Sequence, residues 1–150
     1  MVYENLYEVR PIKDLRDMLN SSTELFGDKA AFLSKPKGRT DYVPISFKQY
    51  KSDVDAFGTA LLDLGLKNGR IAIIGENRYE WSISYLSVVN GTGIVVPLDK
   101  ELPENEIDNL IERSKADAII YSENIKDKIE GLTRKSTSIR YFISMDAKTD

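Results

Sequence analysis

The sequence has neither cysteine nor histidine among its 150 residues. The absence of cysteine excludes disulfides, thiol catalysis and cysteine-ligated metal sites. The absence of histidine removes the side chain that most often acts as a general base or as a metal ligand. Thiol chemistry is therefore excluded, and the commonest acid–base and metal chemistry lacks its usual side chain.

The sequence also lacks long apolar runs and a large excess of charge of one sign. No apolar run approaches the roughly 20 residues that a membrane-spanning helix needs. The polar and acidic start, MVYENLYEVRPIKD, does not resemble a signal peptide. These features predict no transmembrane segment and a cytoplasmic location. The net charge of −3 gives no electrostatic reason to expect a nucleic-acid partner.

The composition is that of a globular protein with a real core. Apolar residues make up 41% of the chain and charged residues 30%, as in ordinary folded domains. A chain of this length forms one domain or part of a larger one.

The N-terminal part, residues 11–70, is predicted to form a helix, a hairpin and a second helix. Residues 11–26 carry apolar side chains at helical spacing. Residues 30–34 and 42–45 read as two strands on either side of a basic turn. Pro44 cannot donate to a strand ladder, so its strand is predicted to be an edge. The first helix has its apolar positions at Ile12, Leu15, Met18 and Leu19.

The second predicted helix begins after Ser46, which suits an N-cap, and ends at Gly65, which suits the position after a helix. Its apolar side chains recur every three or four residues, so we expect them to form a core face. These side chains are Phe47, Tyr50, Val54, Phe57, Leu61 and Leu64.

From residue 71 to 143, short apolar segments alternate with helical patterns. The strands are predicted at 71–74, 94–96, 118–121 and 141–143, the first two buried. Helices are predicted between them, beginning at Asn77 with Glu80 in a capping box, at Pro103, and near Ile125.

This order predicts an α/β fold, because a chain that alternates strand and helix forms a parallel sheet. We expect a β-α-β-α-β-α-β unit over 71–143, with helices on both faces of the sheet, and a short tail over 144–150. No helix follows the last strand to close the unit. We therefore expect a partial domain of a larger enzyme.

The stretch NGTGIVVPLD, from Asn90 to Asp99, raises the question of a phosphate-binding loop. Phosphate loops place glycines after a strand and before a helix, whose N-terminus attracts the anion. Gly91 and Gly93 have the reverse order, and a helix C-terminus repels phosphate. Gly91 is better explained as a helix cap with positive φ, and Gly93 as close helix–strand packing. Gly75 has the right order, but it stands alone and a carboxylate, Glu76, follows it.

The same stretch resembles an early core motif of the adenylate-forming superfamily, which includes acyl-CoA ligases, luciferases and peptide-synthetase adenylation domains. The motifs ISFKQY, LGLKNGRIAIIGENRYEWSISYLSVVNGTG, VVNGTGIVVPLD and LPENEIDNLIERSKADAIIYSE occur in the family's order, over roughly residues 11–143. The wording GENRYEW and PLDKEL is most similar to long-chain fatty acid–CoA ligases. One departure is that the family's Gly-Asp-Arg reads Gly69-Arg70 here.

The resemblance implies an enzyme that uses ATP and Mg²⁺ to convert a fatty acid to an acyl-adenylate, and then transfers the acyl group to coenzyme A. The family's phosphate loop, a Ser/Thr/Gly-rich stretch before Pro-Lys, has no match. The nearest stretch, Ser136-Thr137-Ser138, lacks both the glycine and the Pro-Lys. We therefore predict no catalytic, cofactor-binding or metal residue here.

Three interpretations stay open from the sequence. In the first, the chain is the N-terminal subdomain of a fatty acid–CoA ligase, inactive alone, and its partner is the remainder of its own polypeptide. In the second, the parent is another adenylate-forming enzyme, such as an adenylation domain or an aryl-CoA ligase. In the third, the chain is a free-standing α/β binding or docking module. Under the first, the motif residues are scaffold, namely Asn77, Glu80, Trp81, Gly91, Gly93, Pro97 and Asp99.

Overall fold

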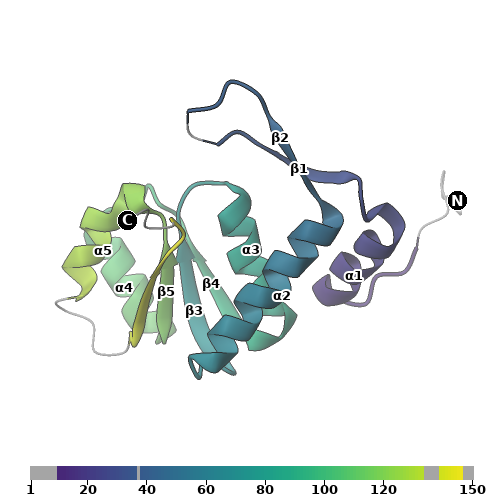
Figure 1. The fold of residues 1–150 in the computed structure, drawn as a ribbon. Coiled ribbons are helices and arrows are strands. Elements are labelled where there is room, and N and C mark those ends of the chain that lie inside the picture. The colour runs from purple at the N-terminus through teal and green to yellow at the C-terminus, as the bar shows by residue number, and fades with distance from the viewer. Residues whose placement is uncertain (1–9, 37, 134–138, 147–150) are drawn as a thin grey trace, which may run out of the picture.

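A four-stranded parallel sheet forms the centre of the chain (Figure 1). The computed structural model describes residues 10–36, 38–133 and 139–146. Within them the sheet has the order β4-β3-β5-β6, and every neighbouring pair is parallel. The predicted α/β fold with a parallel sheet is thereby confirmed. The strands are β3 (Gly69–Ile74), β4 (Gly93–Leu98), β5 (Ala118–Tyr121) and β6 (Tyr141–Ser144).

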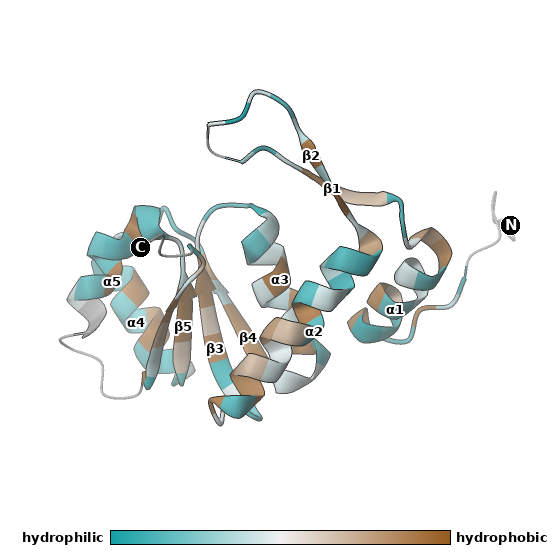
Figure 2. Cartoon of the chain, in the orientation of Figure 1, coloured by the Kyte–Doolittle hydropathy of each residue, from teal (hydrophilic) through white to brown (hydrophobic). Residues whose placement is uncertain are grey.

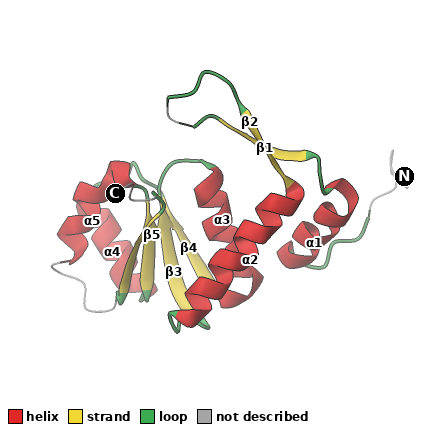
Figure 3. Ribbon diagram, viewed as in Figure 1, coloured by secondary structure: helices red, strands yellow, loops and turns green. Residues whose placement is uncertain are grey.

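Helices cover both faces of this sheet (Figure 3). One face packs against α2 (Phe47–Asp63) and α3 (Tyr79–Ser87), which runs into a π-helical turn, η1 (Val88–Thr92). The other face packs against α4 (Glu104–Ser114) and α5 (Lys126–Thr133), which follows a short 3-10 turn, η2 (Glu123–Ile125). The chain is thus a three-layer arrangement with the sheet in the middle.

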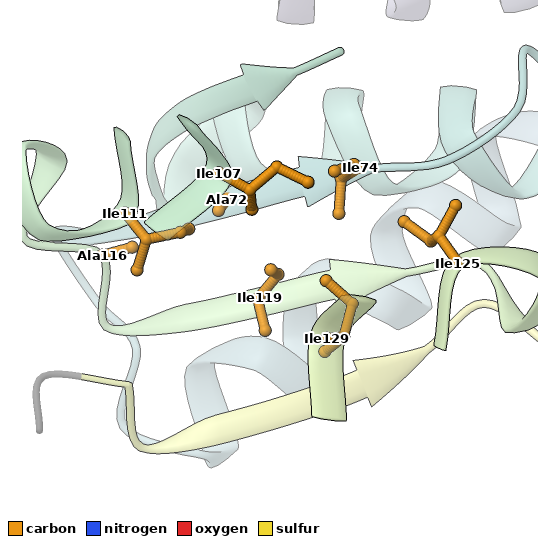
Figure 4. Close-up of a cluster of buried hydrophobic side chains, with 8 residues drawn as sticks. All are labelled: Ala72, Ile74, Ile107, Ile111, Ala116, Ile119, Ile125 and Ile129. Atoms are coloured by element: carbon orange, nitrogen blue, oxygen red, sulfur yellow. The ribbon is translucent and has the colours of Figure 1, made fainter. Parts of the chain in front are cut away.

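Apolar side chains alternate along β3 and β5 between the two cores, because successive strand residues point to opposite faces. Toward α4 and α5 they meet isoleucines of those helices and of η2 (Figure 4). Figure 2 shows the apolar colour concentrated along the strands between the helix layers. The first core comprises Ala72, Ile74, Ile107, Ile111, Ala116, Ile119, Ile125 and Ile129. The second comprises Leu61, Leu66, Ile71, Ile73, Val88, Ala118 and Ile120.

The N-terminal elements stand beside the α2–α3 layer (Figure 1). They are α1 (Leu15–Phe26) and an antiparallel hairpin of β1 (Ala30–Ser34) and β2 (Val43–Ser46), a separate two-stranded sheet. The predicted hairpin and the Ser46 cap, whose Oγ accepts from the Gln49 amide, are confirmed. The first helix begins at Leu15, not at residue 11, because the Asp14 side chain accepts a hydrogen bond from the Asp17 amide and caps it there.

Two apolar side chains near the start of α1 lie outside the core. Ile12, which precedes the helix, is 52% exposed, and Leu15 is 38% exposed. Leu19, one turn further along, is buried against α2 and α3. The apolar stripe of this helix therefore meets the core only in its middle.

The predicted capping box at Asn77 is wrong. Arg78 is the residue that precedes α3, and its side chain makes no capping hydrogen bond. Glu80 instead lies beside the Arg78 guanidinium, at 2.9 Å from Nε. The reason is the position of the helix start: with Arg78 as the cap residue, Glu80 is the second helical residue and not the third, where a capping box needs it.

The strand β4 is less buried than its apolar sequence suggests. It lies at one end of the four-stranded order and pairs only with β3 among the described residues. Ile94 is 56% exposed. A wholly apolar strand thus does not by itself identify a strand buried on both faces, because position in the sheet decides burial.

The two glycines of the NGTG stretch serve different purposes. Gly91 has φ of 148°, so its conformation favours glycine, as predicted for a helix end. Gly93 pairs with Gly69 of β3, and a Cβ there would lie 2.1 Å from the Gly69 carbonyl oxygen. The close contact is therefore between two strands, not between a helix and a strand as the sequence suggested.

Candidate functional site at the carboxyl edge of the sheet

The strand order reverses between β3 and β5. The chain passes from β3 to β4 on one side, then returns to place β5 on the other side of β3. In open parallel sheets, ligands bind outside the carboxyl ends of the strands at such a reversal. The carboxyl edge of β3 and β5 is therefore where this fold would hold a site.

A groove with a volume of about 1120 Å³ lies at this edge, between the hairpin and the start of α3. We call it the edge groove. One wall is formed by residues 32–36 of the hairpin and another by residues 77–82, which include the first turn of α3. Glu123, Asn124 and Asp146, which follow β5 and β6, complete the lining. Segments far apart in the sequence thus meet around one hollow.

Three aromatic rings join the hairpin to the helices beside the groove. The centroid of the Phe32 ring in β1 lies 4.8 Å from the centroid of the Tyr50 ring and 5.1 Å from that of the Tyr79 ring. Both contacts are edge-on. The Tyr79 hydroxyl donates to Asp53 Oδ2 at 2.7 Å. Burial and this carboxylate raise the pKa of Tyr79 well above its usual value. The hydroxyl therefore stays protonated and acts as a structural donor, not as a base.

Arg78 and Asp146 face each other across the groove edge. Arg78 Nη2 donates to Asp146 Oδ1 at 2.8 Å and to the Met145 carbonyl at 3.2 Å. The other carboxylate oxygen, Oδ2, accepts from the Glu123 amide at 2.8 Å. These contacts connect the segments that follow β3, β5 and β6.

Glu76 lies directly after β3, where a phosphate loop would begin. Burial raises the pKa of its carboxyl. The side chains of Ser122, Asn124 and Arg78 lower this pKa by more than burial raises it, so the pKa lies below its usual value. Glu76 is thus negatively charged at neutral pH. Ser122 is fully buried, and its side chain lies about where a Cβ on Gly75 would point, at 3.2 Å. The space after β3 is filled by protein.

The charges of the edge groove do not suit a polyphosphate. Its lining carries three carboxylates, on Glu80, Glu123 and Asp146, and two cations, Lys35 and Arg78. Arg78 is already engaged by Glu80 and Asp146. A phosphate entering here would meet a net negative wall, which disfavours anion binding.

No metal-binding group exists at this edge or elsewhere among residues 10–36, 38–133 and 139–146, since no three carboxylates come together in a suitable cluster. In the same part of the chain, every helix is too short or too polar to cross a bilayer.

A smaller cavity, of about 290 Å³, lies between α2 and the turn η1. Its charged side chains are Arg16, which donates to the Asn90 carbonyl, and Asp55. Its other lining residues are small, apolar or uncharged, including Gly58 and Thr92. It is remote from the strand-order reversal, so the edge groove is the better candidate.

The scaffold residues from the sequence motifs divide between the two ends of the sheet. Asn77, Glu80 and Trp81 line the edge groove. Gly91 and Gly93 lie before β4 and at its first residue, at the opposite end. Pro97 lies in β4, and Asp99 directly follows this strand. Asp99 Oδ1 accepts a hydrogen bond from the Glu101 amide at 2.9 Å. The stretch Ser136-Thr137-Ser138 lies outside the described residues.

The pairing of Arg78 with Asp146 is the part of the site that the sequence pattern missed. The two residues are 68 positions apart. The signal available was that each follows a predicted parallel strand, since such ends meet at one edge of a sheet.

Asp146→Asn is expected to make stability less sensitive to acid. Burial raises the pKa of Asp146. The Glu123 amide and Arg78 lower this pKa by more than burial raises it, so it lies below its usual value of 3.8. This stabilisation is complete above the unfolded-state pKa and is lost as pH falls through the folded one. Melting temperatures measured from about pH 5 down to about pH 2 should thus fall more steeply for the wild type. Parallel curves would contradict the assignment.

Comparison with known proteins gives a consistent result. The family described as AMP-binding enzyme matches residues 19–149. Fatty acyl-CoA synthetase A of Dictyostelium discoideum is 33% identical over 109 residues, covering 72% of this chain and 16% of that protein. Polyketide synthase PksN of Bacillus subtilis is 27% identical over 125 residues, covering 75% of this chain and 2% of that protein.

Among solved structures, a putative long-chain-fatty-acid CoA ligase from Rhodopseudomonas palustris superposes with a TM-score of 0.78 at 20% identity, covering 91% of this chain and 33% of that chain. This likeness shows the fold. The chain spans only a small part of the curated relatives, 16% and 2% of the two above. Because the family match extends over most of its length, this chain belongs to the AMP-binding enzyme family.

Proposed function

We propose that this chain is the N-terminal segment of an ATP-dependent fatty acid–CoA ligase of fatty acid metabolism. The observation that carries the proposal is the 33% identity to a fatty acyl-CoA synthetase over 109 residues. The parent would join a fatty acid carboxylate to AMP, release pyrophosphate, and transfer the acyl group to the thiol of coenzyme A. The motifs GENRYEW and PLDKEL favour long-chain fatty acids as the substrate, and we propose a cytoplasmic location for the enzyme.

We also propose that the chain alone is inactive, and that its partner is the remainder of its own polypeptide. The edge groove supports this, because its carboxylates oppose a polyphosphate and its one arginine is occupied. ATP, Mg²⁺ and coenzyme A would then be held by segments beyond residue 150. In this proposal, residues 11–70 and 71–143 are two parts of one subdomain.

A calorimetric titration of the 150-residue chain with Mg·ATP is expected to show no saturable binding. The physical reason is the net negative groove lining without a phosphate loop. A mutant that removes two of the carboxylates, Glu80→Gln with Glu123→Gln, serves as the control for charge repulsion alone. Saturable micromolar binding by the wild-type chain would contradict the proposal that this segment is inactive alone.

The coding sequence past codon 150 tests the parent enzyme. A continuation into a Ser/Thr-Gly-Thr-Thr-Gly-x-Pro-Lys stretch, and acyl-CoA formation by the encoded polypeptide, are the expected results. A stop codon after Asp150 would exclude ligase activity and favour a docking module.

One observation favours a second candidate, an adenylation domain of a multi-domain synthase. The similarity to polyketide synthase PksN extends over 75% of this chain. The two candidates differ in the acyl acceptor. In the ligase the acceptor is the thiol of free coenzyme A, whereas in the synthase it is a carrier domain. Acyl transfer by the encoded polypeptide to free coenzyme A would select the ligase.

A further inference from the structure

We infer that Arg78 is a positioning residue, which fixes the edge groove by holding the carboxylate of Asp146. This role rests on the proposed function, since it concerns how the ligase site is kept in place. We call Arg78, Asp146 and the Glu123 amide the edge latch.

The geometry of Asp146 leads to this inference. Its Oδ1 accepts from Arg78 Nη2 and its Oδ2 accepts from the Glu123 amide, both at 2.8 Å. One carboxylate therefore bridges the segments after β3 and β5 from a position after β6. Those two segments flank the strand-order reversal where ligands bind in such sheets.

The backbone around Asp146 is held as firmly as its side chain. The Met145 amide donates to the Tyr121 carbonyl at 2.7 Å, and the Met145 carbonyl accepts from Arg78. The Asp146 amide donates to Ser144 Oγ at 3.1 Å. The direction in which the chain leaves β6 is thus determined by contacts on both sides.

The edge latch differs from the exposed ion pairs of the same chain. Arg39 and Asp41 are two positions apart, and their side chains are 56% and 61% exposed. Arg78 and Asp146 are 28% and 35% exposed. Exposed pairs usually contribute little to stability. Arg78 also spans Glu80, Asp146 and the Met145 carbonyl, which suits the planar fork of a guanidinium and not a lysine ammonium.

The same contacts argue against a direct ligand role. Both carboxylate oxygens of Asp146 accept hydrogen bonds within the chain, and Arg78 lies between two carboxylates. A ligand that binds through either residue would compete with the contacts that form the latch. Its role is therefore to hold the wall of residues 77–82 to Glu123 and Asp146, which complete the groove lining, and the effect on a reaction is indirect.

Amide exchange at Glu123 tests the latch in the 150-residue chain. Arg78→Ala and Asp146→Ala are each expected to speed exchange of the Glu123 amide about tenfold, because its acceptor is displaced or lost. Asp41→Ala is the matched control and should leave that amide unchanged. Arg78→Lys keeps the charge without the fork and should fall between wild type and Arg78→Ala. Unchanged exchange in both alanine variants would overturn the latch.

Turnover by the polypeptide of the full reading frame tests the positioning role. Each alanine variant should lower kcat/KM for acyl-CoA formation about ten- to hundredfold, since small displacements at a site are costly. A change in KM for ATP or fatty acid is expected, whereas a loss of folded enzyme alone would lower the apparent kcat only. The loss in the double variant should be smaller than the product of the two single losses, because both single variants remove the contact between Arg78 and Asp146.

The failures of the two proposals are distinguishable. A wild-type polypeptide that forms no acyl-CoA refutes the proposed function, and with it the positioning role in that reaction. A wild-type polypeptide that is active, with latch variants that match it within twofold or whose losses multiply, refutes the positioning role alone.

Discussion

Ile119→Ala is expected to lower the free energy of unfolding by about 2–5 kcal/mol. Ile119 lies in β5, is fully buried, and belongs to the core that faces α4 and α5 (Figure 4). Removing its outer carbons would leave a cavity among other isoleucines, which cannot all move to fill it. Urea denaturation followed by circular dichroism measures the loss, provided that the denaturant slope is unchanged.

Ile94→Ala is the matched control for this prediction. The substitution is chemically identical and also falls in a strand of the same sheet, but Ile94 is 56% exposed. Its expected effect is within about 0.5 kcal/mol, as for ordinary surface positions. Equal losses in the two variants would contradict the described burial of β4 and β5. A large loss at Ile94 alone would mean that another surface covers β4 in solution.

Gly93→Ala is expected to cost about 3 kcal/mol, at the upper end of what overpacking costs. The obstacle is the carbonyl oxygen of Gly69, 2.1 Å from the added Cβ, and a backbone atom cannot rotate away as a side chain can. Relief would require β3 and β4 to separate at their first paired residues. Thermal and urea unfolding of the variant measure the cost.

Gly58→Ala tests whether that cost is specific to the strand contact. Gly58 lies within α2, and a Cβ there would meet the Ser87 carbonyl oxygen at 3.5 Å, an ordinary contact. Alanine favours helix over glycine, so we expect a gain of up to about 1 kcal/mol. A stable Gly93→Ala protein would show that the two strands are further apart than described.

Local patterns predicted most of the elements because they depend on neighbours in the sequence. The Ser46 cap, the positive φ at Gly91 and the four apolar strands are each set by a few consecutive residues. The capping-box pattern failed because α3 begins one residue later than the box requires. Glu80 pairs with Arg78 and does not complete a capping box with Asn77.

Burial along the strands was only partly predictable. The sequence of β4 is as apolar as that of β5, yet Ile94 is exposed while Ile119 is not. The difference is the place of each strand in the order β4-β3-β5-β6. Strand order depends on the crossover connections between strands, and no local apolar pattern encodes it.

The sequence by itself determined the α/β class, the alternation of strands and helices, the family, and the absence of thiol and histidine chemistry. The family came from the resemblance of its ordered motifs, and the other properties follow from composition and from short-range spacing. Only the tertiary structure decided that residues 68 positions apart, Arg78 and Asp146, meet at one groove. Parallel strands bring their carboxyl ends to one edge whatever their separation in the chain, so the partners at that edge are chosen by strand order and not by sequence distance.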